Sequence, residues 1–225
     1  MIKAKEIQIE VSENIGSVSA LLMMPKKTVC VYVFAHGAGA GMHHPFMEKV
    51  ANRLADRNIA TLRYQFPYME KGKRRPDPPK IAIATVKAAI GKAKQVDSTI
   101  PVVAGGKSFG GRMTSQAASK TELPIEGMIF LGFPLHAPGR NSNERADHLK
   151  SISKPMLFLQ GGRDSLAKLE LLEPVIKGLK GMAVLKILEG GDHSFKTRKK
   201  DGISEEEVMD WIANETQNFI KSVDN

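Results

Sequence analysis

The sequence predicts an α/β fold in which a mostly parallel, eight-stranded sheet carries helices on both faces. Apolar runs alternate with helix-compatible stretches along most of the chain, which is typical of βαβ units. The apolar runs are also nearly continuous, as expected for strands that helices cover on both sides. With 225 residues, 42% of them hydrophobic, the chain is long enough for one sizeable core. We therefore expect a single domain over residues 1–225.

The first two predicted strands form a hairpin. Residues 3–11 alternate polar and apolar side chains, as a half-buried strand does, and residues 17–24 follow after a short polar turn. Because no helix separates them, one strand should run antiparallel in an otherwise parallel sheet. Further strands are predicted at residues 29–35, 59–66, 101–106, 127–133, 155–160 and 183–188, and helices at 45–57, 80–96, 110–120, 144–152, 166–180 and 204–222.

Ser108 lies in the segment Gly106-Lys107-Ser108-Phe109-Gly110-Gly111, between an apolar run and a helix-compatible run. A strand, a sharp turn and a helix in this order lift a serine hydroxyl clear of the sheet edge. Strand and helix approach closely there, so small residues are needed two places before and two after the serine. Glycines occupy both places. The motif alone fits either a catalytic elbow or a glycine-rich loop. The residues on later loops favour a nucleophile over a serine that only caps the helix.

A carboxylate and an imidazole follow two later strands. Asp164 comes after the apolar run at 155–160, and His193 comes after the run at 183–188. The carboxyl ends of parallel strands meet at one sheet edge, so we expect these side chains to lie near Ser108. In this interpretation His193 takes the serine proton and Asp164 orients the imidazole. Asp164 could cap the following helix as well, and the two roles are compatible.

Two other carboxylates lie close to His193 in the sequence. Asp192 is its direct neighbour, and neighbouring side chains in an extended loop tend to point opposite ways. Glu189, just past its strand, meets a similar objection. We therefore prefer Asp164 as the acid.

Backbone amides near the serine can bind the negative charge that develops on a carbonyl oxygen. One candidate is the N–H of Phe109, directly after Ser108. The second is the N–H of Ala38, in a loop of small residues that follows the strand at 29–35. The amides of Gly37 and Gly39 are the alternatives.

Other histidines and a lysine are further candidates. His136 follows the strand at 127–133 and is a candidate substrate-binding residue, or else a loop histidine bonded to backbone. Lys107 either borders the site or packs beneath it. Adjacent histidines such as His43 and His44 cannot readily chelate one ion, and no other metal-ligand spacing accompanies them. The prediction is a site without metal or cofactor.

Together these motifs resemble those of α/β-hydrolases of the small dienelactone-hydrolase-like group. The similarity is closest to the short hydrolase-like proteins grouped with the vertebrate testis-expressed hydrolase-like protein, and it extends from Cys30 to the end of the chain. It implies an α/β-hydrolase fold with Ser108 as nucleophile, Asp164 as acid and His193 as base, and it supplies no substrate. The matching segments are His36–Gly39, Gly106–Arg112, Phe133–Pro138, Gly161–Asp164 and Asp192–Phe195.

Composition limits the partners that we expect. The formal net charge is +9, but the dense basic clusters at 71–75 and 196–200 contain no interleaved aromatics that could stack on bases. We interpret them as solvated surface and predict no specific nucleic-acid partner. The N-terminus lacks the apolar core of a signal peptide, and no segment approaches membrane-spanning length. A cytoplasmic protein that binds no membrane is expected, with Cys30 buried in its strand.

The function predicted from these features is hydrolysis of a small carboxylic ester, thioester or amide through an acyl-enzyme. The loop at 134–143 is short and polar, so it cannot build a large apolar lid over the site. The alternative is a hydrolase-fold protein that binds or scaffolds with little or no turnover. The oligomeric state is left open.

Overall fold

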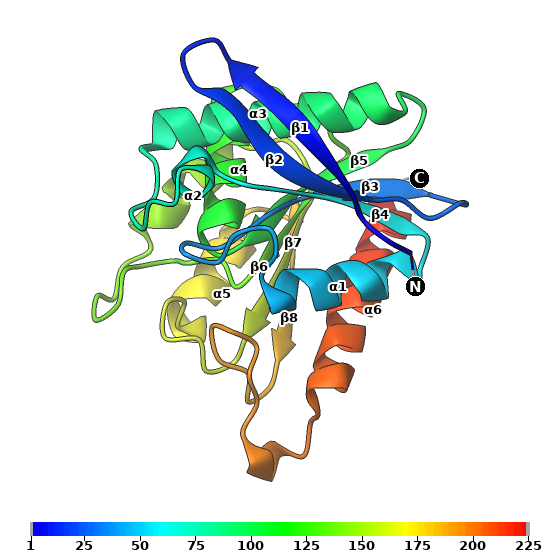
Figure 1. Cartoon of the computed structure of the whole chain (residues 1–225). Helices are drawn as coiled ribbons and strands as arrows, with labels where there is room; N and C mark the ends of the chain where they lie inside the picture. Colours follow the sequence, from blue (N-terminus) through cyan, green and yellow to red (C-terminus); the bar gives the residue numbers. More distant parts are fainter. Residues whose placement is uncertain (1, 224–225) are drawn as a thin grey trace.

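The computed structural model describes residues 2–223 and shows one mixed sheet with helices on both faces (Figure 1). The strands are β1 (Lys5–Ser12), β2 (Gly16–Met23), β3 (Cys30–Ala35), β4 (Ile59–Tyr64), β5 (Val102–Lys107), β6 (Gly127–Leu131), β7 (Met156–Gly161) and β8 (Ala183–Leu188). The α-helices are α1 (Pro45–Ala55), α2 (Pro67–Glu70), α3 (Pro79–Val96), α4 (Phe109–Lys120), α5 (Leu169–Gly178) and α6 (Glu205–Val223), and the 3₁₀ helices are η1 (Glu144–Ser151) and η2 (Lys199–Asp201).

The strand order is β1-β2-β4-β3-β5-β6-β7-β8. Strand β2 is antiparallel to both of its neighbours, and every other pair in the described chain is parallel. The prediction of an N-terminal hairpin that leaves one antiparallel strand is therefore confirmed. The strands β3 and β5 to β8 end at the same edge of the sheet, and the loops that follow β5, β7 and β8 carry the predicted site residues.

Side chains of the central strands pack alternately into two cores. In β3, Val31 and Val33 face the core beneath α3, α4 and α5, whereas Tyr32 and Phe34 face the core beneath α1 and α6. All six residues of β3 are buried, Cys30 among them, because helices cover both faces of the strand. This double cover explains why the central strands are nearly continuous apolar runs. Figure 1 shows α1 and α6 side by side on one face and α3 with α4 on the other.

Several segments differ from the prediction, among them η2, which was not predicted. The helix expected at 144–152 is a 3₁₀ helix in which Ala146 and Leu149 are buried, and this spacing of three matches the 3₁₀ turn. The helix expected from residue 166 begins only at Leu169, because the chain after Asp164 first makes a side-chain-bonded turn. The short helix α2 was not predicted, and it starts with Pro67 in its first turn, where the missing N–H costs nothing.

Within residues 2–223, none of the helices combines the length and the apolar character that crossing a bilayer requires.

Candidate active site

The turn between β5 and α4 holds Ser108 in a strained conformation, with φ 49° and ψ −111°. Gly106 and Gly110, on either side of Ser108, leave no room for a side chain. A Cβ added to Gly106 would lie 2.3 Å from the Ala35 carbonyl oxygen, and one added to Gly110 would lie 2.6 Å from the Ala35 Cβ. The Ser108 side chain does not cap α4. The close approach of β5, α4 and the end of β3 thus presents the hydroxyl at the sheet edge.

Ser108, His193 and Asp164 form a continuous hydrogen-bonded chain. Ser108 Oγ lies 2.9 Å from His193 Nε2, and His193 Nδ1 lies 2.7 Å from Asp164 Oδ2. The Asp164 carboxylate is buried, whereas the imidazole is partly exposed. An imidazole bonded to a carboxylate through Nδ1 presents Nε2 as an acceptor, so it can take the serine proton. The structure therefore brings together the three residues that the sequence placed on three separate loops.

Three donors surround the Asp164 carboxylate. Besides the imidazole, Leu166 N–H donates to Oδ1 at 2.8 Å and Gln160 Nε2 donates to Oδ2 at 2.5 Å. Asp164 does not cap α5, whose N-cap residue is Lys168. Gln160 was missed from the sequence, although a polar residue inside the apolar run Met156–Gly161 was a signal for it.

The neighbouring carboxylate, Asp192, shapes the loop instead of facing the imidazole. Its Oδ1 accepts hydrogen bonds from the backbone N–H groups of Ser194 at 2.8 Å and Lys196 at 2.9 Å. These bonds close a tight turn around His193. Asp192 and Asp164 therefore have different partners although both lie near the same imidazole.

Lys107 contacts the loop that carries His193, called the histidine loop below. Its Nζ donates to the His193 carbonyl oxygen at 2.6 Å and lies 5.5 Å from the centre of the Phe195 ring. Burial lowers the pKa of Lys107 to about 8, against the opposing effect of Asp164 and Asp192. The side chain thus packs beneath the histidine loop, which is one of the two positions that the sequence allowed.

The loop after β3 lies beside the serine. A Cβ added to Gly37 would lie 3.8 Å from Ser108 Cβ. The Gly39 N–H donates to the Tyr68 hydroxyl at 3.1 Å and therefore already has an acceptor within the protein. The N–H groups of Ala38 and Phe109 have no acceptor among residues 2–223. Of the two alternatives to Ala38, Gly39 is therefore disfavoured.

His36 anchors this loop and was not singled out from the sequence. Its Nε2 accepts from the Phe66 N–H at 3.1 Å, so its Nδ1 carries the proton and donates to the Gly37 carbonyl at 2.7 Å. The ring is fully buried, and burial lowers the pKa of His36 to about 4. A neutral imidazole therefore ties the loop to the segment that follows β4.

His136 lies between two loops and is 2% exposed. Its Nδ1 lies 3.0 Å from the Ala137 carbonyl oxygen, and its backbone N–H donates to the Leu166 carbonyl at 3.0 Å. Its Nε2 is buried without a partner among the described residues. The structure does not bond His136 to Ser108 or His193.

The paired histidines have a local role at the start of α1. His44 is the N-cap residue, and its Nδ1 accepts from the Phe46 N–H at 3.2 Å. His43 and His44 belong to no group of three or more potential metal ligands within residues 2–223.

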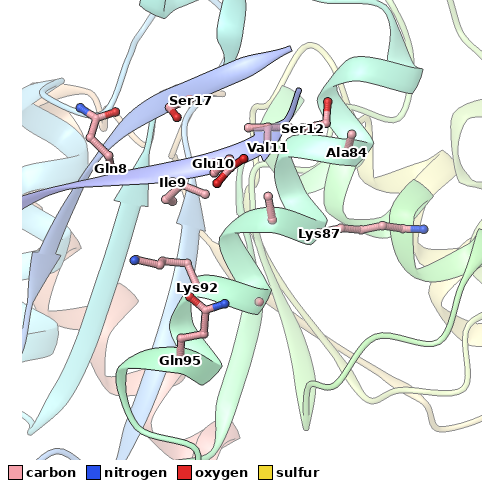
Figure 2. A pocket seen from close by; sticks show the side chains of 12 residues that line it. Gln8, Ile9, Glu10, Val11, Ser12, Ser17, Ala84, Lys87, Lys92 and Gln95 are labelled. Carbon is pink, nitrogen blue, oxygen red and sulfur yellow. The ribbon is translucent and has the colours of Figure 1, made fainter. Parts of the chain in front are cut away.

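Two hollows of the described chain lie outside the hydrogen-bonded trio of Ser108, His193 and Asp164. The first, of about 810 Å³, is an open groove between the β1–β2 hairpin and α3, with Lys87, Lys92 and Gln95 on its helix side (Figure 2). Three strands separate β1 from β5, so this groove is remote from Ser108. The second, of about 720 Å³, lies at Tyr68 and the exposed basic loop that includes Lys73. Neither hollow is lined by Ser108, Asp164 or His193.

The class of protein follows from this fold and from the family comparison. The model of the alpha/beta hydrolase domain family matches residues 28–221, so the chain belongs to that family. The sheet order, the glycine-flanked elbow and the sequence of the three site loops agree with this membership.

Solved structures share the whole architecture. A dienelactone hydrolase from Anabaena variabilis superposes with a TM-score of 0.79 at 18% identity, covering 99% of this chain and 98% of that one. A Xanthomonas campestris serine hydrolase described as lacking a lid gives a TM-score of 0.75 at 16% identity, covering 99% and 96%. At these identities the likeness shows the fold alone.

Curated relatives are longer than this chain. Two Mycobacterium tuberculosis proteins, provisionally named phosphoribosyl transferases, are 26% identical to it over 196 residues. The match covers 85% of this chain and 42% of each relative, so the chain spans less than half the length of those proteins.

Proposed function

We propose that the protein is a serine hydrolase that cleaves small carboxylic esters, thioesters or amides, with esters as the first choice. The observation that carries this proposal is the unbroken hydrogen-bonded chain from Asp164 through His193 to Ser108, at 2.7 and 2.9 Å. Such a chain lets a buried carboxylate fix the imidazole tautomer that accepts the serine proton.

The proposed reaction has two halves. His193 takes the proton of Ser108 while Oγ attacks the carbonyl carbon, and the proton then passes to the leaving group as the carbon–leaving-group bond breaks. Water repeats the sequence on the acyl-serine and releases the acid. The N–H groups of Phe109 and Ala38 bind the oxyanion, and the N-terminus of α4 adds a favourable dipole there.

Small substrates fit the proposal best. Only residues 132–143 separate β6 from η1, and a loop of this length cannot build a large apolar roof over Ser108. One structural neighbour is described as a serine hydrolase without a lid, which is consistent with an open site. Within the family, we place the chain with the short hydrolase-like proteins of the testis-expressed group, on the motifs it shares with them.

A fluorophosphonate probe and p-nitrophenyl acetate or butyrate test the proposal. We expect the wild-type protein to be labelled and to hydrolyse the esters, and Ser108→Ala to abolish both without unfolding the protein. Ser115→Ala is the matched control. Ser115 is a buried serine of α4, and its Oγ also lies near a histidine, 2.8 Å from His148 Nε2. It should retain labelling. Unchanged turnover in folded Ser108→Ala would remove the nucleophile assignment, and a folded wild-type protein without labelling or turnover would favour a binding or scaffold role.

A further inference from the structure

Gln160 holds the carboxylate that faces His193. It is the last residue but one of β7 and is 0% exposed. Its Oε1 accepts from the Phe133 N–H at 3.0 Å, and its Nε2 donates to Asp164 Oδ2 at 2.5 Å. One buried amide therefore joins the segment after β6 to the acid after β7.

This amide is satisfied in only one of its two orientations. The Phe133 N–H is a donor, so the amide oxygen must face it and the NH₂ group is left facing the carboxylate. The reverse orientation would set donor against donor at Phe133 and acceptor against acceptor at Asp164. The fold thus provides Asp164 with a fixed donor.

The donor acts on the oxygen that orients the imidazole. Asp164 Oδ2 accepts from Gln160 and also lies 2.7 Å from His193 Nδ1, while Oδ1 accepts from the Leu166 N–H at 2.8 Å. Because both oxygens are bonded, rotation of the carboxylate would break at least one of these bonds. The plane of the carboxylate, and with it the direction of the imidazole, is set by its neighbours.

We propose that Gln160 is a positioning residue that keeps Asp164 turned towards His193, an inference that rests on the proposed hydrolase function. A purely structural role, in which Gln160 only links the loop after β6 to the loop after β7, explains these bonds less well. The two loops are already linked by the His136 N–H, which donates to the Leu166 carbonyl at 3.0 Å. Gln160 acts on the reaction only through Asp164.

The test compares two substitutions that affect the donor differently. Gln160→Glu keeps the shape of the side chain, but an ionised carboxylate cannot donate to Asp164. At lower pH the two facing carboxyl groups share a proton, and a donor is restored. Gln160→Met removes the donor at every pH. Gln95→Glu, at an exposed position on α3, makes the same chemical change as a control.

The proposal predicts how the kcat/KM of each variant, relative to wild type, changes with pH. At about pH 8.5, kcat/KM of Gln160→Glu should be about 10- to 100-fold below wild type, the factor that a hydrogen bond to a charged group provides. This deficit should shrink towards about pH 6. Gln160→Met should show a deficit that does not depend on pH, and Gln95→Glu none. A Gln160→Glu deficit that is absent, or that is independent of pH, would overturn the proposal.

A spectroscopic measurement separates this inference from the proposed function. The His193 Nδ1 proton, bonded to Asp164, should give a far-downfield proton resonance in the wild-type protein whether or not esters are hydrolysed. In Gln160→Glu the resonance should disappear as the pH is raised. If the resonance of Gln160→Glu persists unchanged as the pH is raised, the positioning role is overturned, even if the protein has no turnover. A wild-type protein that hydrolyses esters but lacks the resonance would overturn it while the hydrolase assignment stands.

Discussion

At the scale of single residues, two carboxylates near His193, one in space and one in sequence, differ in what they bind. Asp164 lies 2.7 Å from His193 Nδ1, while Asp192 Oδ1 accepts two backbone N–H groups of its own loop. In the sequence, direct adjacency to His193 counted against Asp192, whereas the position of Asp164 just after a strand, between Ser108 and His193 in chain order, favoured it. The difference in partners makes the two acids separable by mutation.

Asp164→Asn should lower kcat by about 10⁴-fold, because the amide keeps the shape but stabilises the wrong imidazole tautomer. Asp192→Asn should retain most of the wild-type kcat, since its remaining Oδ1 still accepts from the Ser194 and Lys196 N–H groups. Steady-state kinetics with p-nitrophenyl butyrate measure both. If Asp192→Asn proved the more damaging change, the acid would have to be reassigned.

At the scale of elements, the site depends on how closely α4 crosses the end of β3. Gly110, in the first turn of α4, faces the Ala35 Cβ and the His36 carbonyl oxygen, and an added Cβ would lie 2.6 Å from each. Gly91, in the interior of α3, lies beside the groove of Figure 2, and an added Cβ there meets nothing within 4 Å. Gly110 is therefore required by the close contact between α4 and the end of β3, whereas no packing contact requires Gly91.

Gly110→Ala should destabilise the protein by about 1–3 kcal/mol, the cost of forcing atoms into a packed contact. Gly91→Ala should instead stabilise it by about 0.5–1 kcal/mol, because alanine loses less backbone entropy in a helix than glycine. Urea unfolding at neutral pH measures both free energies. Equal effects of the two substitutions would show that the crossing of α4 and β3 is looser than described.

At the scale of the whole molecule, the loop after β3 is held by the segment that follows β4. His36 accepts from the Phe66 N–H, Tyr68 accepts from the Gly39 N–H, and Gln65 Oε1 accepts from the Met42 N–H at 3.0 Å. These contacts couple the proposed oxyanion loop to the stability of the fold. They also make that stability depend on the protonation of a buried imidazole.

The pKa of His36 is about 4 in the folded protein and 6.5 in the unfolded chain. Between these values the unfolded chain binds the proton more tightly, so stability rises with pH in this window and falls as pH is lowered through it. From pH 7 to pH 5 the loss from this group should be about 2 kcal/mol. His36→Gln, which stays neutral, should lose correspondingly less over the same interval in urea unfolding. An equal loss in both proteins would exclude His36 as the source.

The sequence by itself determined the succession of the strands along the chain, most of the helices, the N-terminal hairpin and the three loops that carry Ser108, Asp164 and His193. These features depend on local patterns, namely apolar runs, flanking glycines and the position of a polar residue just after a strand. Whether the three residues catalyse hydrolysis stays a prediction.

Only the tertiary structure decided which polar groups hold those loops in place. Gln160 bonds to Phe133, 27 residues away, and His36 bonds to Phe66, 30 residues away. Such partners are neighbours because parallel strands bring their carboxyl ends to one edge, and no local pattern records which strand will lie beside which. The same holds for the loop after β3, where the Tyr68 hydroxyl accepts from the Gly39 N–H and so disfavours Gly39 as the alternative to Ala38. Buried polar groups must find partners wherever the packing of distant segments supplies them, and that packing belongs to the folded chain alone.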